Sequence, residues 1–213
     1  MARKSRTTLS LDEAMRHNLI LFNNPVLIQG LALTPVVAAA VSLKTACILS
    51  VVAAILIVPT RVAGDLLIGY VAKNLRPMIY AILSSLCFVP ALLLAELIFG
   101  LAVRGPENYL LLLVVDGIVL SRAEIPAREG IGRALGNGIL TALGFSLVLC
   151  LVGSVRDLLS NGKIWDLTIH TGIQVPIAST VVGGLLITAM LSALLQWLGT
   201  VYKRFISGGV KEQ

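Results

Sequence analysis

Five stretches of this chain carry no charged residue, and they limit its possible folds more than any other feature. They cover residues 18–43, 45–60, 77–95, 134–155 and 171–202. A sixth stretch, residues 105–121, carries only Glu107 and Asp116. A helix needs about 20 apolar residues to cross a lipid bilayer, with about 17 as a lower limit. The spacing of the charges therefore predicts a series of membrane-spanning helices.

The composition excludes several other classes of protein. Hydrophobic residues make up 57% of the 213 residues and charged residues 13%, against about 25% charged in a typical soluble domain. A soluble protein of this size cannot bury so much apolar surface, which excludes a soluble enzyme, a disordered chain and a secreted disulfide scaffold. The net charge of +6 does not indicate nucleic-acid binding, because the basic residues fall in small groups between the apolar stretches.

We expect an all-α integral membrane protein with six transmembrane helices. The segments lie near residues 25–43, 45–63, 77–101, 108–121, 134–156 and 176–200. The second is short, and Arg61 can extend it by reaching to the membrane surface. The fourth is shorter still and contains a carboxylate, which is typical of a broken or half-crossing helix. The membrane domain would cover residues 19–202, between a polar N-terminal segment (1–18) and a tail (203–213).

Lysines and arginines predict the orientation of these helices, because cytoplasmic loops are enriched in both. Thirteen fall at the termini and in the loops after the second and fourth segments. The opposite side has four: Lys44, Arg104, Arg156 and Lys163. We therefore expect both termini in the cytoplasm and the chain in the inner (cytoplasmic) membrane.

A short pattern recurs in the two halves of the chain, as RVAGDLLIG at residues 61–69 and SVRDLLSNG at residues 154–162. Each copy follows the second segment of its half. Halves of three segments enter the membrane from opposite sides, so this recurrence predicts an inverted repeat over about 23–101 and 106–200. The alternative is that Asp-Leu-Leu recurs by chance in a leucine-rich chain.

Two breaks are expected inside the apolar segments. One falls at residues 32–35 (ALTP) in the first segment, and the other at residues 115–117 (VDG) in the fourth. Proline removes a backbone donor and kinks a helix, and glycine tolerates unusual backbone angles. Inverted repeats place functional positions at such breaks, where the first segments of the two halves meet.

Several motifs of this chain occur together in one known family. They are NNPVLIQGLALTP at residues 23–35, VDGIVLSRAE at 115–124, GNG at 136–138, GSVRD at 153–157 and NG at 161–162. With these motifs and its six-segment layout, the chain resembles the RnfE/NqrD family of membrane subunits over about residues 12–165.

The resemblance implies a fold and a setting. Members of this family are membrane subunits of ion-translocating complexes that pass electrons between ferredoxin or NADH and NAD or quinone. Each pairs with a homologous subunit of opposite topology, called RnfA or NqrE, in a complex with flavin and iron–sulfur subunits. Between the paired subunits lies an intramembrane [2Fe-2S] cluster, held by two cysteines from each. In the family, one cysteine precedes the proline of the first segment and the other stands at the break of the fourth.

This chain departs from the family at both ligand positions. They are occupied by Thr34 and Gly117, whereas such a cluster requires thiolate ligands. The three cysteines, Cys47, Cys87 and Cys150, lie elsewhere, with no pair at the breaks. Free cysteine is commonly buried, so we interpret them as small packing residues. We therefore expect no metal and no cluster bound by this chain in the family manner.

Two carboxylates inside apolar segments are candidates for an ion pathway. A charged group at the centre of a membrane helix costs about 2.5–3.5 kcal/mol on insertion scales, so it usually faces a cavity or a partner. Asp116, beside the helix-breaking Gly117, could hold a proton or cation, or could hydrogen-bond the opposite broken helix. Glu96 lies nearer a membrane face, where it could join the pathway or pair with Arg104.

Polar groups at the ends of the first and fourth segments are candidates for docking partner subunits: Asn23, Asn24, Arg122 and Glu124. For the loop pair the alternative is a solvated cytoplasmic surface whose ion pairs contribute little. His17 and His170 have no second ligand at a usable spacing, so neither indicates a metal site.

Two classes of function fit these features. The first is a non-catalytic membrane subunit of an Rnf- or Nqr-like complex, acting as a scaffold and possible ion pathway without the family's cluster. The second is a repurposed transporter or channel for an ion or small solute on the same fold. A purely structural assembly subunit is a third interpretation.

Overall fold

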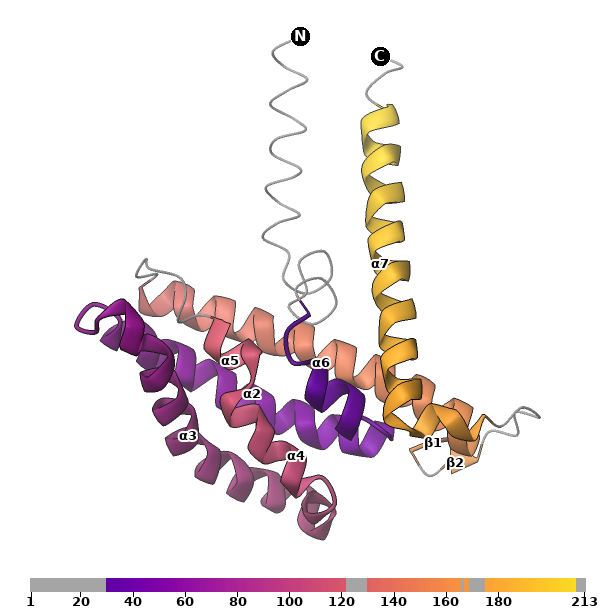
Figure 1. The fold of residues 1–213 in the computed structure, drawn as a ribbon, viewed down its shortest axis with the longest axis horizontal. Coiled ribbons are helices and arrows are strands. Elements are labelled where there is room, and N and C mark those ends of the chain that lie inside the picture. Colours follow the sequence, from indigo (N-terminus) through magenta and orange to yellow (C-terminus); the bar gives the residue numbers. More distant parts are fainter. Residues whose placement is uncertain (1–29, 122–129, 166, 169–174, 210–213) are drawn as a thin grey trace.

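The structure, a computed structural model, describes residues 30–121, 130–165, 167–168 and 175–209. Four of its helices contain stretches long and apolar enough to cross a membrane. They are α2 (Leu43–Leu67), α3 (Arg76–Phe99), α6 (Ile131–Asn161) and α7 (Val181–Gly209), shown in Figure 1. A shorter apolar stretch covers Asn108–Leu120. The prediction of a helical membrane protein is confirmed at this level.

Short elements connect and flank these helices. They are η1 (Pro35–Ala39), η2 (Lys73–Leu75), η3 (Gly100–Arg104), α4 (Glu107–Leu112), η4 (Leu113–Val115), α5 (Gly117–Leu120), β1 (Lys163–Ile164), β2 (Leu167–Thr168) and η6 (Pro176–Ser179). The element η1 is a π-helix and the other η elements are 3₁₀ helices. The strands β1 and β2 pair antiparallel in a minimal hairpin after α6, a small departure from the all-helical expectation.

Helix α2 is longer than the sequence predicts. Ser42 caps it by accepting a hydrogen bond from the Thr45 N–H at 3.3 Å, and it continues through Pro59 to Leu67. The prediction ended this segment at residue 63, with Arg61 reaching to the membrane surface. Instead, the Arg61 guanidinium donates a hydrogen bond to the Thr141 hydroxyl of α6 at 3.2 Å. Proline is tolerated inside membrane helices when neighbouring groups satisfy the freed carbonyl.

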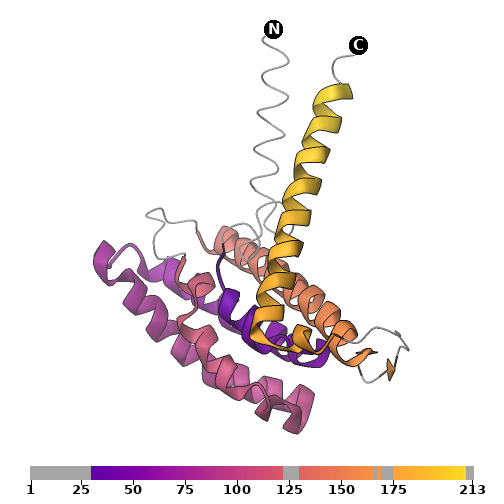
Figure 2. The same ribbon diagram turned by 45° about the vertical axis from the view of Figure 1, so that its right-hand side comes forward.

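Helices α2 and α6 run side by side in opposite directions and form the centre of the molecule (Figures 1 and 2). Glycines on α6 permit their close approach. A Cβ at Gly153 would lie 2.7 Å from the Ala46 Cβ, and one at Gly138 would lie 3.5 Å from the Val58 Cα. Lipid tails are as apolar as leucine, so membrane helices associate through close packing at small residues rather than through the hydrophobic effect.

Helix α7 is placed differently from the others. It begins against η1, η6 and α6, and then extends away from them in both views (Figures 1 and 2). Ile187, Leu191 and Leu195 pack against the core from one side of this helix. Most of its other large side chains between residues 181 and 201 are exposed. Lipid or another protein chain must cover that surface in a membrane.

The first expected segment, residues 25–43, is not a regular α-helix where the structure describes it. From residue 30 it consists of a turn, the π-helix η1 and a short connection to α2. The fourth expected segment is broken as predicted, into α4, η4 and α5.

Candidate functional site

The first break lies between Gly30 and Val41. Gly30 and Ala32 both have positive φ, +69° and +56°, and such an angle is uncommon at alanine. The chain then forms η1, in which the Ala40 N–H donates to the Pro35 carbonyl at 3.2 Å, the five-residue spacing of a π-helix. Single π-turns are rare and occur frequently at functional sites.

The second break is centred on Asp116, whose backbone is extended between η4 and α5. Its carboxylate accepts a hydrogen bond from the Ile118 N–H at 3.2 Å and so caps α5. The backbone N–H groups of Gly117 and Ala32 also donate to this carboxylate. Since Ala32 belongs to the first break, Asp116 joins the two breaks directly.

The contact between the breaks is close. Asp116 is 8% exposed, and a Cβ at Gly117 would lie 3.2 Å from the Leu31 side chain. The two breaks therefore meet at this contact. Asp116 thus accepts from the backbone of the opposite broken segment at Ala32.

Thr34 and Gly117 stand at the two breaks, at the positions where the resemblance implied cluster ligands. Thr34 is exposed and Gly117 is half-buried. Neither residue carries sulfur, and glycine offers no side-chain ligand at all. Within the described parts of the chain, no group of three or more His, Cys, Asp or Glu side chains is placed to hold a metal ion.

A cavity of about 260 Å³ lies beside the first break, between the end of η1, the start of α2 and the start of α4. Lys44 is the charged residue of its lining, and Thr45 and Tyr109 add hydroxyl groups. Asp116 and Thr34 do not line it. The cavity therefore does not connect the carboxylate at the breaks to the surface.

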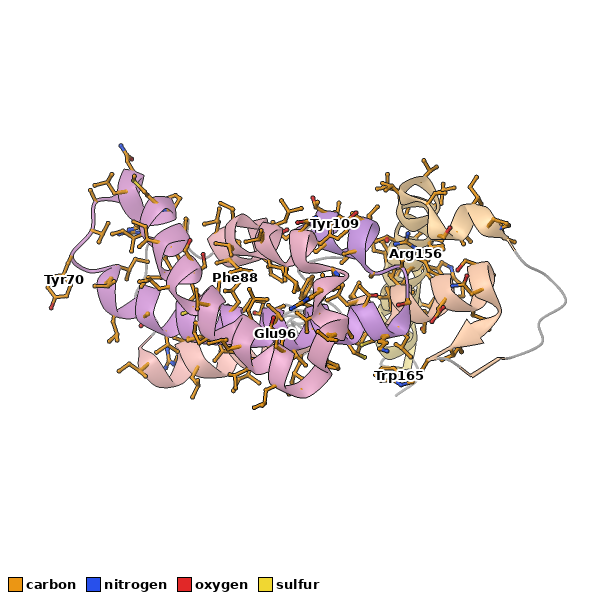
Figure 3. All side chains as sticks on the ribbon, turned by 90° about the horizontal axis from the view of Figure 1, so that it is seen from below. Tyr70, Phe88, Glu96, Tyr109, Arg156 and Trp165 are labelled. Atoms are coloured by element: carbon orange, nitrogen blue, oxygen red, sulfur yellow. The ribbon has the colours of Figure 1, made fainter. Side chains whose placement is uncertain are left out.

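Arg156 has a role that the sequence interpretation missed. The basic-residue count placed it at the far membrane surface, but α6 continues past it to Asn161 and Arg156 is completely buried. In Figure 3 it lies where the early part of the chain, the end of α6 and the start of α7 come together. The expectation of a surface arginine is wrong, because the helix carries this side chain inward.

The Arg156 guanidinium donates to five backbone carbonyls on two segments. On the first break it reaches the carbonyls of Val37 at 2.6 Å and Ala40 at 3.2 Å. Before α7 it reaches the carbonyls of Ala178, Ser179 and Thr180 at 2.9–3.0 Å. These carbonyls lie in or directly after η1 and η6, and the Thr180 carbonyl also accepts from the Gly184 N–H of α7 at 3.0 Å. Arg156 thus holds the first break and the entry to α7 in one arrangement.

Two glycines at the start of α7 make room for this arrangement. A Cβ at Gly184 would lie 2.8 Å from the Val37 carbonyl and 3.0 Å from the Arg156 guanidinium. A Cβ at Gly183 would collide with the Ile177 carbonyl. The absence of side chains at this pair admits the Val37 and Ile177 backbone and the arginine side chain.

Asp65 and Asp157 make matching contacts at opposite ends of the central helix pair. Asp65, near the end of α2, accepts from the Gly130 N–H at the start of α6 at 3.0 Å. Asp157, near the end of α6, accepts from the Leu43 N–H at the start of α2 at 3.4 Å. These are the aspartates of the two recurring Asp-Leu-Leu patterns.

The remaining predicted residues lie apart from the breaks. Glu96 is exposed in the last turn of α3 (Figure 3), and the described residues show no ion pair between Glu96 and Arg104. The docking candidates Asn23, Asn24, Arg122 and Glu124 lie outside the described residues, as do His17 and His170.

Known proteins match this chain over most of its length. The model of a family described as "Rnf-Nqr subunit, membrane protein" matches residues 14–199. The E subunit of the ion-translocating oxidoreductase complex of Shewanella loihica is 32% identical over 146 residues, which is 68% of this chain and 62% of the relative. The same subunits of Shewanella oneidensis and Shewanella amazonensis are 32% and 30% identical over the same length. The chain thus spans 62% of the length of these curated relatives.

Proposed function

This chain belongs to the Rnf-Nqr family of membrane subunits, and we propose that it serves in an ion-translocating electron transport complex of the Rnf or Nqr type. In that complex it is a scaffold and a possible ion pathway rather than a catalytic subunit. The observation that carries this proposal is the meeting of two helix breaks through Asp116, inside the region that matches the family.

The proposed architecture is an inverted repeat with six membrane segments. The reciprocal contacts of Asp65 and Asp157 support it, because equivalent residues of the two halves hold the starts of opposite helices. The antiparallel packing of α2 on α6 supports it as well. With 13 basic residues on one side and three on the other once the buried Arg156 is left out, both termini are proposed to lie in the cytoplasm and the chain in the inner membrane.

The family's [2Fe-2S] cluster does not fit the residues at the two breaks. Thiolates hold such a cluster, and Thr34 and Gly117 supply none. The space beside Gly117 is also narrow, since the Leu31 side chain would be 3.2 Å from a Cβ there. We propose that this chain binds no cluster at these positions.

Asp116 is proposed to join the halves, and ion handling is the alternative role. Three backbone N–H groups already donate to its carboxylate, so its oxygens have hydrogen-bond partners without any bound cation. An Asp116→Asn variant keeps one carbonyl oxygen as the helix cap. Ion translocation by the assembled complex should therefore survive this change if the role is structural, and should fail if the carboxylate carries the ion.

The proposed partners are a homologous membrane subunit of opposite topology and the flavin and iron–sulfur subunits of the complex. Affinity purification of the tagged full chain in mild detergent, with mass spectrometry of the bound subunits, tests this. Recovery of these partners supports the proposal. Recovery of a lone homodimer that conducts ions in vesicles overturns the proposal. That result favours the second class of function, a transporter or channel on the same fold.

The spectrum of the same preparation tests the cofactor proposal. An EPR spectrum of the reduced complex should be unchanged when Thr34 or Gly117 is replaced by alanine in material that still assembles. A [2Fe-2S] signal that disappears with either substitution contradicts the proposal that this chain binds no cluster there.

A further inference from the structure

Two of the three cysteines face each other across the central helix pair. Cys47 lies in the second turn of α2 and Cys150 in the middle of α6, 103 positions apart in the sequence. Their thiols are within hydrogen-bonding reach of each other. The sequence interpretation treated both as isolated packing residues, because nothing in their spacing indicates this contact.

The geometry of the helix pair explains the contact. Ala46 and Gly153 stand next to the cysteines, and a Cβ at Gly153 would lie only 2.7 Å from the Ala46 Cβ. The two backbones are therefore unusually close at this level. A disulfide needs Cα atoms about 4.4–6.8 Å apart, a separation that helices reach only where small residues let them approach.

Ser50 adds a polar group to the pair. Its hydroxyl donates to the Ala46 carbonyl at 2.7 Å, and its oxygen lies 3.9 Å from the Cys150 sulfur. Because that proton is already engaged, the oxygen is placed as an acceptor for the Cys150 S–H. Both cysteines are partly exposed, and Cys47 is less than one turn from the exposed Lys44, so a small reagent can approach from the helix surface.

We propose that Cys47 and Cys150 form a dithiol site that is oxidised to a disulfide joining α2 to α6. The oxidant is an external disulfide, which reacts by exchange through the thiolate. One cysteine attacks it, forms a mixed disulfide and releases one thiol. The second cysteine then attacks the mixed disulfide, forms the Cys47–Cys150 bond and releases the second thiol. Two cysteine thiols are oxidised, and one external disulfide is reduced to two thiols.

The consequence is a redox-sensitive restraint between the two halves of the molecule. The helix α2 belongs to the first half and α6 to the second, and the disulfide would fix their mutual register. This inference rests on the contact between the two thiols and does not depend on the proposed complex or its partners.

Treatment of the full chain in native membranes with 4,4′-dithiodipyridine, followed by intact-mass measurement, tests the proposal. The Cys87→Ser variant removes the third cysteine and is the working background. It should release two thiopyridone molecules per chain, lose two hydrogen atoms in mass and retain no pyridine adduct. Adding Cys47→Ser or Cys150→Ser should each leave one stable adduct on the remaining cysteine.

The failure of the proposal has a distinct signature. Two pyridine adducts on the Cys87→Ser chain would overturn the proposal. So would a chain without adducts in which Cys47 and Cys150 are both still free thiols after denaturation. Cys47→Ala and Cys150→Ala serve as second variants where serine impairs folding. Dibromobimane, which becomes fluorescent on bridging two nearby thiols, should label the Cys87→Ser background and neither of its single-cysteine derivatives.

Discussion

Helices α6 and α7 have similar apolarity but very different surroundings. The mean hydropathy of the most apolar stretch is 2.2 in α6 and 1.9 in α7, yet 50% of that stretch is buried in α6 and 17% in α7. The difference lies in the small and polar residues. Helix α6 presents glycines and polar side chains to α2. In the described part of α7, the glycines that allow close contacts lie in its first turn.

This contrast indicates how a membrane protein distinguishes a packed helix from a peripheral one. Apolar area alone cannot do so, because lipid satisfies it as well as protein does. A helix prefers protein over lipid as its neighbour where glycines allow close approach and where hydrogen bonds join the segments. In this chain both are concentrated on α6, which contacts α2, the first break and the start of α7.

The largest effect is expected at Arg156, which joins α6 to both η1 and η6. Arg156→Met keeps the length of the side chain but removes the guanidinium donor from five carbonyls, of which the Thr180 carbonyl keeps the Gly184 N–H. Each buried unsatisfied group costs about 1–3 kcal/mol, so we expect a loss of at least about 3 kcal/mol. Heating the tagged protein in detergent, with size-exclusion readout of the folded fraction, measures the change in Tm.

Matched variants separate the bonds of Arg156 from its charge. Arg156→Lys keeps the charge but has fewer donors and no planar fork, so its Tm should fall between those of Arg156→Met and the wild type. Arg104→Met removes an exposed arginine and should leave the Tm unchanged. A wild-type Tm for Arg156→Met would contradict the role assigned to this residue.

Two glycines of α6 provide the next test, with effects of opposite sign. Gly153→Ala places a Cβ 2.7 Å from Ala46, whereas nothing lies within 4 Å of a Cβ at Gly136. Overpacking typically costs about 1–3 kcal/mol, and alanine is favoured over glycine in a helix by about 0.5–1 kcal/mol. The Tm should therefore fall for Gly153→Ala and stay level or rise for Gly136→Ala. Equal shifts would show that α2 and α6 do not pack on Gly153.

The interlocking aspartates should have a smaller effect. Asp157→Ala removes the acceptor for the Leu43 N–H and for the Asn161 side chain. Losing a helix-capping acceptor costs about 1 kcal/mol, so the Tm should fall by less than in Gly153→Ala. Asp157→Asn keeps an oxygen and should recover part of the loss. If Asp157→Ala has no effect while Asp65→Ala does, the two ends of the pair are not equivalent.

The sequence predicts the elements of this fold much better than their contacts. Charge-free stretches identify α2, α3 and α6 to within about five residues, because a bilayer requires that length of apolar chain. They identify α7 less closely, since it begins five residues and ends nine residues after the predicted bounds. Proline and glycine identify both breaks, because their effect on the backbone is local to the residue itself. The end of α2 is missed, since neither Pro59 nor Arg61 terminates a helix whose polar groups find partners on α6.

Two of the contacts that the sequence does not reveal join residues more than 100 positions apart. Arg156 meets Val37 across 119 positions, and Cys47 meets Cys150 across 103. Both depend on the antiparallel register of α2 and α6, which no local pattern specifies. The recurring Asp-Leu-Leu pattern is the one sequence signal related to that register, and its two aspartates do lie at opposite ends of the pair.

The smallest effect is expected on α7. Leu194 is 52% exposed, whereas Leu149 on α6 is fully buried, and both can be replaced by alanine. Leu149→Ala should cost about 2–5 kcal/mol through the cavity it creates, but Leu194→Ala in the isolated subunit should leave the Tm unchanged. If Leu194→Ala instead destabilises the isolated chain as much as Leu149→Ala does, α7 packs along its length and the contrast with α6 fails. If the isolated chain is unaffected but the variant loses stability when purified with bound subunits, the exposed face of α7 is covered by protein rather than by lipid.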